Sequence, residues 1–311
     1  MSVYLWYKIG GEVKFLLECS TKEDVLEAFQ FIKKEKIKKY FVAGLGSNLL
    51  FTDEYFEGAV IQITSEDNSA VKLINSNTIE AFAGVTLDSV IRFAFENGLV
   101  GLEWAGGLPG TVGAAVRGNV GAFGGEIKDT FAGAEILDST SFKTKKLNKR
   151  DIRFSYRSST VKKNHNMIIL SAQFNLEKAD DAKVSRARQV YLANISYRNN
   201  KHPMDLPSTG SSFKNINNPE EIEKILAVFP DIEQEIKVKW HGKVSMGYLN
   251  KRLDLSGLQI GMGQISNKHS NFIVNLGGAT FLDVKNIIDK IQKTFQDVFG
   301  FIPEPEVEIV N

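Results

Sequence analysis

Three polar side chains stand in sequence contexts that suit chemistry. Arg157, in the run FSYRSST, is a permanent cation whose N–H groups can grip a carboxylate through two bonds. Ser211 lies in PSTGSSFKN, which lacks the G-x-S-x-G pattern and an obvious histidine partner; this argues against a hydrolase nucleophile, but a serine can donate a proton. Glu306 stands between prolines and strand-like residues near the C-terminus. Taken singly, Arg157 is better explained as a surface arginine and Glu306 as a solvated charge.

Two glycine loops offer main-chain N–H groups but no side chain that could act as an acid, a base or a nucleophile. Residues 101–126 hold nine glycines, a density that neither an amphipathic helix nor an ordinary strand needs. Residues 44–48 (GLGSN) follow a strand-like run and form a second loop. Successive N–H groups can line a concavity that holds an anion, so a phosphate or dinucleotide cradle is one interpretation and tight turns in a β-rich domain are the other. Leu49 stands where G-x-G-x-x-G requires glycine, so the dinucleotide motif is incomplete.

The elements that must position these residues mix strands and helices without the regular alternation of a Rossmann domain, which predicts an α+β fold. Apolar periodicity predicts helices that begin at the capping pair Ser20 and Glu23 and that cover residues 87–97, 181–198, 218–228, 245–253 and 281–299. Alternating and β-branched runs predict a hairpin over residues 3–18 and strands near 40–43, 59–63, 71–74, 78–83, 131–138, 152–156, 167–176, 258–264, 271–275 and 303–310.

Composition restricts the class of protein. The chain has 311 residues, enough for two or three domains, and a net charge of +1, which predicts neither a nucleic-acid nor a membrane partner. Cys19 is the single cysteine, which excludes an intrachain disulfide, and no signal peptide is visible, so we expect a cytoplasmic protein. The four histidines lack metal-ligand spacing, so we expect no metal site. We also expect a monomer.

Read in order, these motifs resemble the UDP-N-acetylenolpyruvoylglucosamine reductases, flavoenzymes of bacterial cell-wall precursor synthesis. The resemblance runs nearly the whole length of the chain. It covers residues 7–11 (YKIGG), 44–50 (GLGSNLL), 101–103 (GLE), 107–113 (GLPGTVG), 119–126 (NVGAFGGE), 156–158 (YRS), 207–215 (PSTGSSFKN), 265–275 (ISNKHSNFIVN) and 304–307 (EPEV).

The resemblance implies FAD bound non-covalently between two α+β lobes of the vanillyl-alcohol-oxidase type, with a further lobe for the UDP-sugar. We expect the first lobe at residues 1–65, joined by the strand at 301–311, the second at 66–200 and the substrate lobe at 201–300. By matching positions, the cofactor contacts would come from Gly44, Leu45, Gly46, Ser47, Asn48, Leu49, Pro109, Gly110, Thr111, Gly113, Ala114, Asn119 and Gly121.

The implied reaction is the NADPH-dependent reduction of UDP-N-acetylglucosamine enolpyruvate to UDP-N-acetylmuramate. NADPH reduces FAD, and hydride then passes from flavin N5 to the methylene carbon of the enolpyruvyl group. Arg157 and Glu306 match residues that bind and polarise the substrate carboxylate, with Glu306 carrying or sharing a proton. Ser211 matches the proton donor. The positions of Lys201, Asn215, His269 and Phe123 match substrate contacts.

This chain departs from the family pattern at a few positions. Phe123 stands where many members have tyrosine, Leu45 fills a position that is often glycine, and Lys251 and Asp254 replace the usual acidic residue and glycine. The chain has no insertion for a substrate-covering tyrosine loop, which indicates the subtype without it. Two other functions stay open: another FAD-linked oxidase or dehydrogenase, which acid denaturation would reveal if its flavin were covalent, and a non-catalytic nucleotide-binding protein, which would bind UDP-sugar without oxidising NADPH.

Overall fold

The computed structural model describes residues 1–311 apart from the side chain of Asn68, and it divides the chain into two compact units. Unit 1 consists of residues 1–12, 46–55 and 201–311, and unit 2 consists of residues 13–45 and 56–200.

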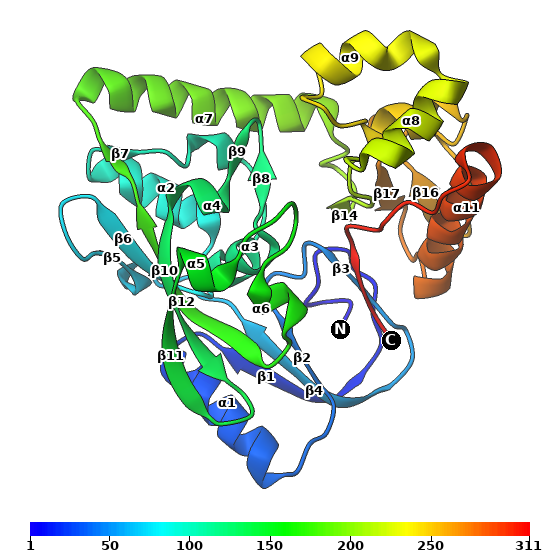
Figure 1. Cartoon of the computed structure of the whole chain (residues 1–311). Coiled ribbons are helices and arrows are strands. Elements are labelled where there is room, and N and C mark those ends of the chain that lie inside the picture. Colours follow the sequence, from blue (N-terminus) through cyan, green and yellow to red (C-terminus); the bar gives the residue numbers. More distant parts are fainter. The chain divides into compact units, whose positions relative to one another are not determined.

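Unit 2 opens with a parallel sheet in the strand order β1-β4-β2. β1 (Val13–Cys19) and β2 (Tyr40–Ala43) both run parallel to β4 (Phe56–Ile63). α1 (Lys22–Lys34) connects β1 to β2, which lie on either side of β4, and it packs against β1 and β4 (Figure 1). The helix begins at a capping box made by Thr21 and Asp24, one residue later than the predicted pair.

The hairpin predicted over residues 3–18 is wrong. Residues 2–7 form turns, and β1 pairs with β4 instead of turning back on an earlier strand. The cause is Gly11, whose N–H donates to the Thr52 carbonyl at 2.7 Å and where a Cβ would lie 2.2 Å from the Asp53 carbonyl oxygen. The glycine pair therefore lets the chain pass close to residues 52–54 and does not form a turn between strands.

The larger sheet of unit 2 is antiparallel, in the order β11-β10-β12-β6-β5. The predicted strand at 152–156 is wrong, because residues 149–152 form a helical turn capped by Asn148. An unpredicted edge strand precedes it, and its sequence, KTKKLN, is lysine-rich and exposed. Such composition blunts a sheet edge, but it lacks the apolar alternation that marks a strand in sequence. The strands are β5 (Val71–Leu73), β6 (Thr78–Phe82), β10 (Phe131–Asp138), β11 (Lys143–Asn148) and β12 (Met167–Asn175).

Further short elements of unit 2 surround this sheet, and one buried apolar cluster joins both sheets to the helices. The strand pairs are β7 (Leu99–Val100) with β13 (Glu177–Lys178), and β8 (Gly121–Ala122) with β9 (Gly125–Glu126). The helices are η1 (Asn68–Ala70), α2 (Leu87–Glu96), η2 (Glu103–Ala105), α3 (Val112–Gly118), α4 (Ile127–Thr130), α5 (Lys149–Ile152), α6 (Thr160–Lys163) and the long α7 (Asp181–Lys201), the last of which continues into unit 1.

Unit 1 has its own core around a sheet in the order β14-β17-β16-β15. The long helix α11 (Phe281–Phe299) packs against β15 and β16 and confirms its prediction, including the Thr280 cap and the left-handed Gly300. The other elements are β3 (Leu49–Phe51), β14 (Ser208–Ser211), α8 (Pro219–Val228), η3 (Pro230–Ile232), α9 (Glu233–Val238), α10 (Met246–Arg252), β15 (Gln259–Ile260), β16 (Gly263–Ile265), β17 (Phe272–Asn275) and β18 (Glu308–Val310).

Residues 1–12 and 46–55 form one compact unit with residues 201–311. Within this unit β18 pairs in parallel with β3, from Glu308 opposite Leu49 to Val310 opposite Phe51. The loop at residues 44–48 is thus where the chain passes from one unit into the other. The division into three lobes stays a prediction.

Gly125 gives a test of packing in unit 2. A Cβ at this position would lie 2.3 Å from Cγ of the buried Trp104 indole, and a rigid ring cannot move aside cheaply. We expect Gly125→Ala to lower the free energy of unfolding by about 1–3 kcal/mol, as overpacking does. Thermal unfolding of the variant and the wild type measures this loss of stability. Gly118→Ala is the control, since its Cβ would meet nothing closer than 3.7 Å in α3, and a loss of stability there would contradict the argument.

Candidate active site

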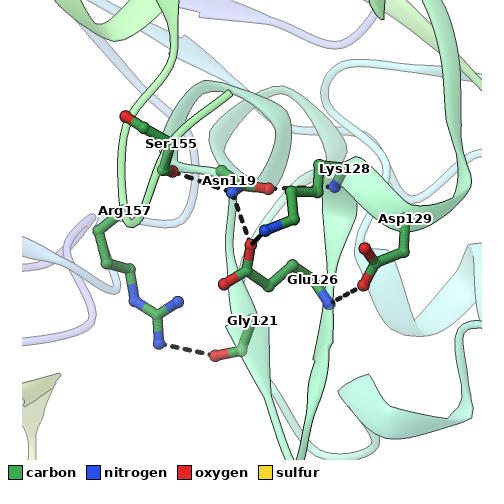
Figure 2. A network of polar contacts seen from close by, with 7 residues as sticks. All are labelled: Asn119, Gly121, Glu126, Lys128, Asp129, Ser155 and Arg157. Carbon is green, nitrogen blue, oxygen red and sulfur yellow. Dashed lines mark hydrogen bonds and ion pairs between the residues drawn. The ribbon is translucent and has the colours of Figure 1, made fainter. Parts of the chain in front are cut away.

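Asn119 organises the glycine segment of unit 2. It is fully buried, adopts the left-handed conformation with φ 43°, and ends α3. Its Nδ2 donates to Glu126 Oε2 and to the Ser155 carbonyl, both at 3.0 Å, and its Oδ1 accepts from the Lys128 N–H at 3.0 Å (Figure 2). The amide therefore ties the β8–β9 hairpin to the turn that carries the Arg157 segment. A direct contact from Asn119 to FAD stays a prediction.

Arg157 is turned toward the same hairpin. Its Nη2 donates to the Gly121 carbonyl at 2.7 Å (Figure 2), and its guanidinium lies 5.2 Å from the Tyr156 ring centre. Its backbone φ is 53° and that of Phe123, at the hairpin tip, is 49°. A bulky residue in this region is strained, and such strain gathers at ligand-binding sites. The structure thus brings three predicted site residues of unit 2 together: Arg157, Gly121 and Asn119.

Phe123 is 46% exposed at the tip of this hairpin. Its ring meets Tyr197 edge-on at 5.4 Å, and the Arg198 guanidinium lies 5.1 Å from its centre. Arg198 also donates Nε–H to the Gly106 carbonyl at 3.0 Å, and burial lowers the pKa of this guanidinium. Tyr197 and Arg198 are not among the predicted site residues. Both lie in a helix of mostly polar residues, where no periodic signal distinguishes them.

The two glycine loops meet within unit 2. A Cβ on Gly44 would lie 2.5 Å from Thr111 Oγ1, so the first loop can approach the second only as bare backbone. Gly110 has φ 145°, a conformation that favours glycine, and its carbonyl accepts from the Leu87 N–H at 3.0 Å. Gly113 instead serves packing, since its N–H donates to the Ala83 carbonyl at 2.9 Å. A pyrophosphate cradle at these loops stays a prediction.

The remaining predicted cofactor residues lie on or beside these loops. In unit 2, Leu45 and Pro109 are half-buried and Ala114 is exposed on α3. In unit 1, Gly46 has φ 67°, and a Cβ there would lie 2.4 Å from Leu5 Cδ2. Ser47 and Asn48 follow half-buried, and Leu49 is buried where β3 begins.

Ser211 and Glu306 come together in unit 1. Ser211 ends β14, where it lies opposite Phe272 of β17. The Glu306 N–H donates to the carbonyl of Ser212 at 2.8 Å, so the two candidate catalytic residues stand on adjacent segments. Gly210, just before Ser211, has φ 74° and open space at its Cβ position. Arg157 belongs to the other unit.

The predicted substrate residues of unit 1 differ in their surroundings. Lys201 is exposed at the end of α7. The Asn215 Oδ1 accepts from the Met246 N–H at 3.1 Å, which anchors the first turn of α10. The His269 ring lies edge-on to His202, 5.1 Å between centres, and 4.8 Å from Phe272. The unusual residues Lys251 and Asp254 are both exposed, so neither disturbs the core.

Burial lowers the pKa of His269 below its ordinary value of 6.5. The unfolded chain therefore takes up this proton at a higher pH than the folded chain does. We expect the free energy of unfolding to fall as the pH drops below 6.5 until the folded-state pKa is reached, and His269→Gln to remove that part of the dependence. Denaturant unfolding between pH 8 and 5 measures the free energy of unfolding on both sides of the ordinary histidine pKa of about 6.5. A pH dependence of unchanged size in His269→Gln would contradict the prediction.

Within the described part of the chain, no group of three or more His, Cys, Asp or Glu side chains could hold a metal ion. None of the helices described above is both long and apolar enough to cross a membrane.

Comparisons with known families match both parts of the chain. Residues 13–141 match an FAD binding domain, and residues 202–310 match the C-terminal domain of UDP-N-acetylenolpyruvoylglucosamine reductase. These matches confirm the expected α+β fold with an FAD-binding domain.

Individual relatives extend over the full length. The chain is 36% identical over 305 residues to the UDP-N-acetylenolpyruvoylglucosamine reductase of Caldicellulosiruptor saccharolyticus, covering 98% of this chain and 88% of that protein. It is 34% identical to that of Clostridium botulinum strain Eklund 17B, covering 100% and 91%. The crystal structure of UDP-N-acetylenolpyruvylglucosamine reductase from Thermus caldophilus superposes with a TM-score of 0.75 at 26% identity, over 100% of this chain and 97% of that one.

Proposed function

Because the chain belongs to the UDP-N-acetylenolpyruvoylglucosamine reductase family, whose members are FAD-binding oxidoreductases, we propose that it reduces UDP-N-acetylglucosamine enolpyruvate to UDP-N-acetylmuramate with NADPH. The reaction would serve peptidoglycan precursor synthesis. The observation that carries this proposal is the end-to-end similarity to proteins of that name, which includes both the flavin domain and the C-terminal domain.

FAD, when bound, supplies the hydride that it receives from NADPH. Gly44, Gly110 and Thr111 would hold it through the facing glycine loops, together with the other predicted positions along residues 44–49 and 109–121. Lys201, Asn215, His269 and Phe123 would contact the UDP-sugar.

Arg157, Glu306 and Ser211 would supply the protein's part in the chemistry. Hydride addition to the methylene carbon moves negative charge toward the substrate carboxylate. Arg157 would stabilise that charge with its guanidinium N–H donors. Glu306 would polarise the same carboxylate while it carries or shares a proton. Ser211 Oγ then gives its proton to the adjacent carbon, which completes the reduction.

An anaerobic stopped-flow experiment tests this proposal. The purified protein should be yellow, and NADPH should bleach the flavin absorbance. Addition of UDP-N-acetylglucosamine enolpyruvate should restore the absorbance and yield UDP-N-acetylmuramate. A flavin that NADPH reduces but this substrate does not reoxidise would favour another FAD-linked oxidase or dehydrogenase. UDP-sugar binding without any flavin reduction would favour a non-catalytic protein.

A further inference from the structure

Glu306 is held through both of its main-chain polar groups. Its N–H donates to the Ser212 carbonyl at 2.8 Å, and its carbonyl accepts from the Asn48 Nδ2 at 3.0 Å. Neither of these two bonds uses the carboxyl group. The peptide units on both sides of Glu306 are therefore fixed, and the direction in which its side chain leaves the backbone is fixed with them.

Asn48 is itself rigidly supported. Its carbonyl accepts from the Glu308 N–H at 3.0 Å, and the next residue, Leu49, begins β3, which pairs with β18. On the other side, Gly46 packs so closely against Leu5 that a side chain there would collide. The Asn48 amide therefore stays in place, and it can hold the Glu306 carbonyl where it is.

The segment before Glu306 is anchored by Phe213 and Lys214, which come shortly after Ser211. Lys214 forms an ion pair with Glu304, and its N–H donates to the Glu304 carbonyl at 3.1 Å. Phe213 forms a bridge with Pro305, whose ring restricts the backbone further. Residues 304–306 thus lie alongside residues 212–214, which come directly after the strand that carries Ser211. The side-chain amide of Asn48 holds the carbonyl of Glu306.

We propose that Asn48 is a positioning residue that sets the Glu306 carboxyl for its action on the substrate. This inference rests on the proposed function, because it takes Glu306 to act on the enolpyruvyl carboxylate. An amide has two ends: Nδ2 donates to Glu306, and Oδ1 is an acceptor that this bond leaves unused. Asn48 therefore links the glycine loop expected to contact FAD to the residue expected to polarise the substrate.

The test uses Asn48→Asp, which keeps the shape and Oδ1 but removes the donor and repels the Glu306 carbonyl. Asn48→Ala is the second variant, should the aspartate impair folding. Asn97→Asp is the matched control, because the Asn97 Nδ2 donates to the Phe93 carbonyl at 2.8 Å at the end of α2, outside the candidate site. In anaerobic stopped flow, with FAD added to fill the flavin site, the reduction of both Asn48 variants by NADPH is measured first and separately, because Asn48 is also a predicted FAD contact. Reoxidation by the enolpyruvyl substrate should slow by about 10-fold to 100-fold, as expected for a misplaced group.

A double-mutant cycle separates positioning from general damage. If Asn48 acts through Glu306, Asn48→Asp should slow reoxidation much less in a Glu306→Gln background than in the wild type. Equal slowing in both backgrounds would overturn the proposal, as would wild-type reoxidation of the FAD-loaded Asn48 variants, or flavin reduction that slows as much as reoxidation does. Failure of the wild-type protein to be reoxidised by this substrate would instead refute the proposed function.

Discussion

Replacing Ser211 with alanine should stop the second half of the reaction and spare the first. NADPH should still bleach the flavin, because hydride transfer to FAD needs no proton from Ser211. Reoxidation by the enolpyruvyl substrate should slow by about 10²–10⁴-fold, the usual contribution of a positioned proton donor. Single-turnover absorbance traces of the two half-reactions measure both effects in one preparation.

The geometry around Ser211 suits this role. The residue ends β14, and the preceding Gly210 leaves open space at its Cβ position, so a ligand can approach the backbone here. Pairing with Phe272 fixes the strand, and the bond from Glu306 to Ser212 holds a carboxyl-bearing residue beside it. A proton donor and a group that polarises the substrate would therefore be fixed relative to each other.

Ser212 is the matched control for Ser211. Its side chain is 2% exposed, and its hydroxyl has no hydrogen-bond partner among the described residues. Ser212→Ala keeps the main-chain bond to Glu306 and removes an unpaired buried polar group, so activity should persist and stability should not fall. Slow reoxidation in Ser212→Ala, or wild-type turnover in Ser211→Ala, would contradict the assignment of the proton donor.

Elements with a strong local signal were predictable from sequence. α11 has apolar residues at Val284, Ile287, Ile288 and Ile291, a Thr280 cap and a terminal Gly300, and the structure places its bounds at the predicted residues. α2 begins after Thr86 as predicted. In such helices periodicity, caps and burial agree, so tertiary contacts confirm the local preference.

Features that depend on distant contacts were not predictable. The aromatic run at residues 3–18 resembles a hairpin until Gly11 is seen to approach residues 52–54. The edge strand β11 is hidden by its lysines. Motif matching placed Asn48 with the cofactor contacts, but only the structure shows its amide on the Glu306 carbonyl, 258 residues away in the chain. Arg198 contacts Phe123 and Gly106 from a helix without a distinguishing pattern.

Arg157→Lys should lower kcat/KM for the enolpyruvyl substrate by about 10²–10³-fold, as loss of a donor to developing charge does in other enzymes. The guanidinium carries its N–H donors in a planar fork, which can bind a carboxylate through two bonds. A lysine keeps the charge but has a single nitrogen, which cannot reproduce this planar fork. Flavin reduction by NADPH should stay at the wild-type rate, and stopped-flow reoxidation at varied substrate concentration gives the measured ratio.

Arg153 provides the control for this substitution. It is exposed and, like Arg157, has a positive φ, 46° against 53°, so a lysine at either position meets similar backbone strain. Arg153→Lys should therefore leave turnover unchanged. If both variants lose activity equally, the effect comes from the strained backbone or the overall charge. If neither does, a positive charge alone is sufficient at Arg157 and the two-bond grip on the substrate carboxylate is wrong.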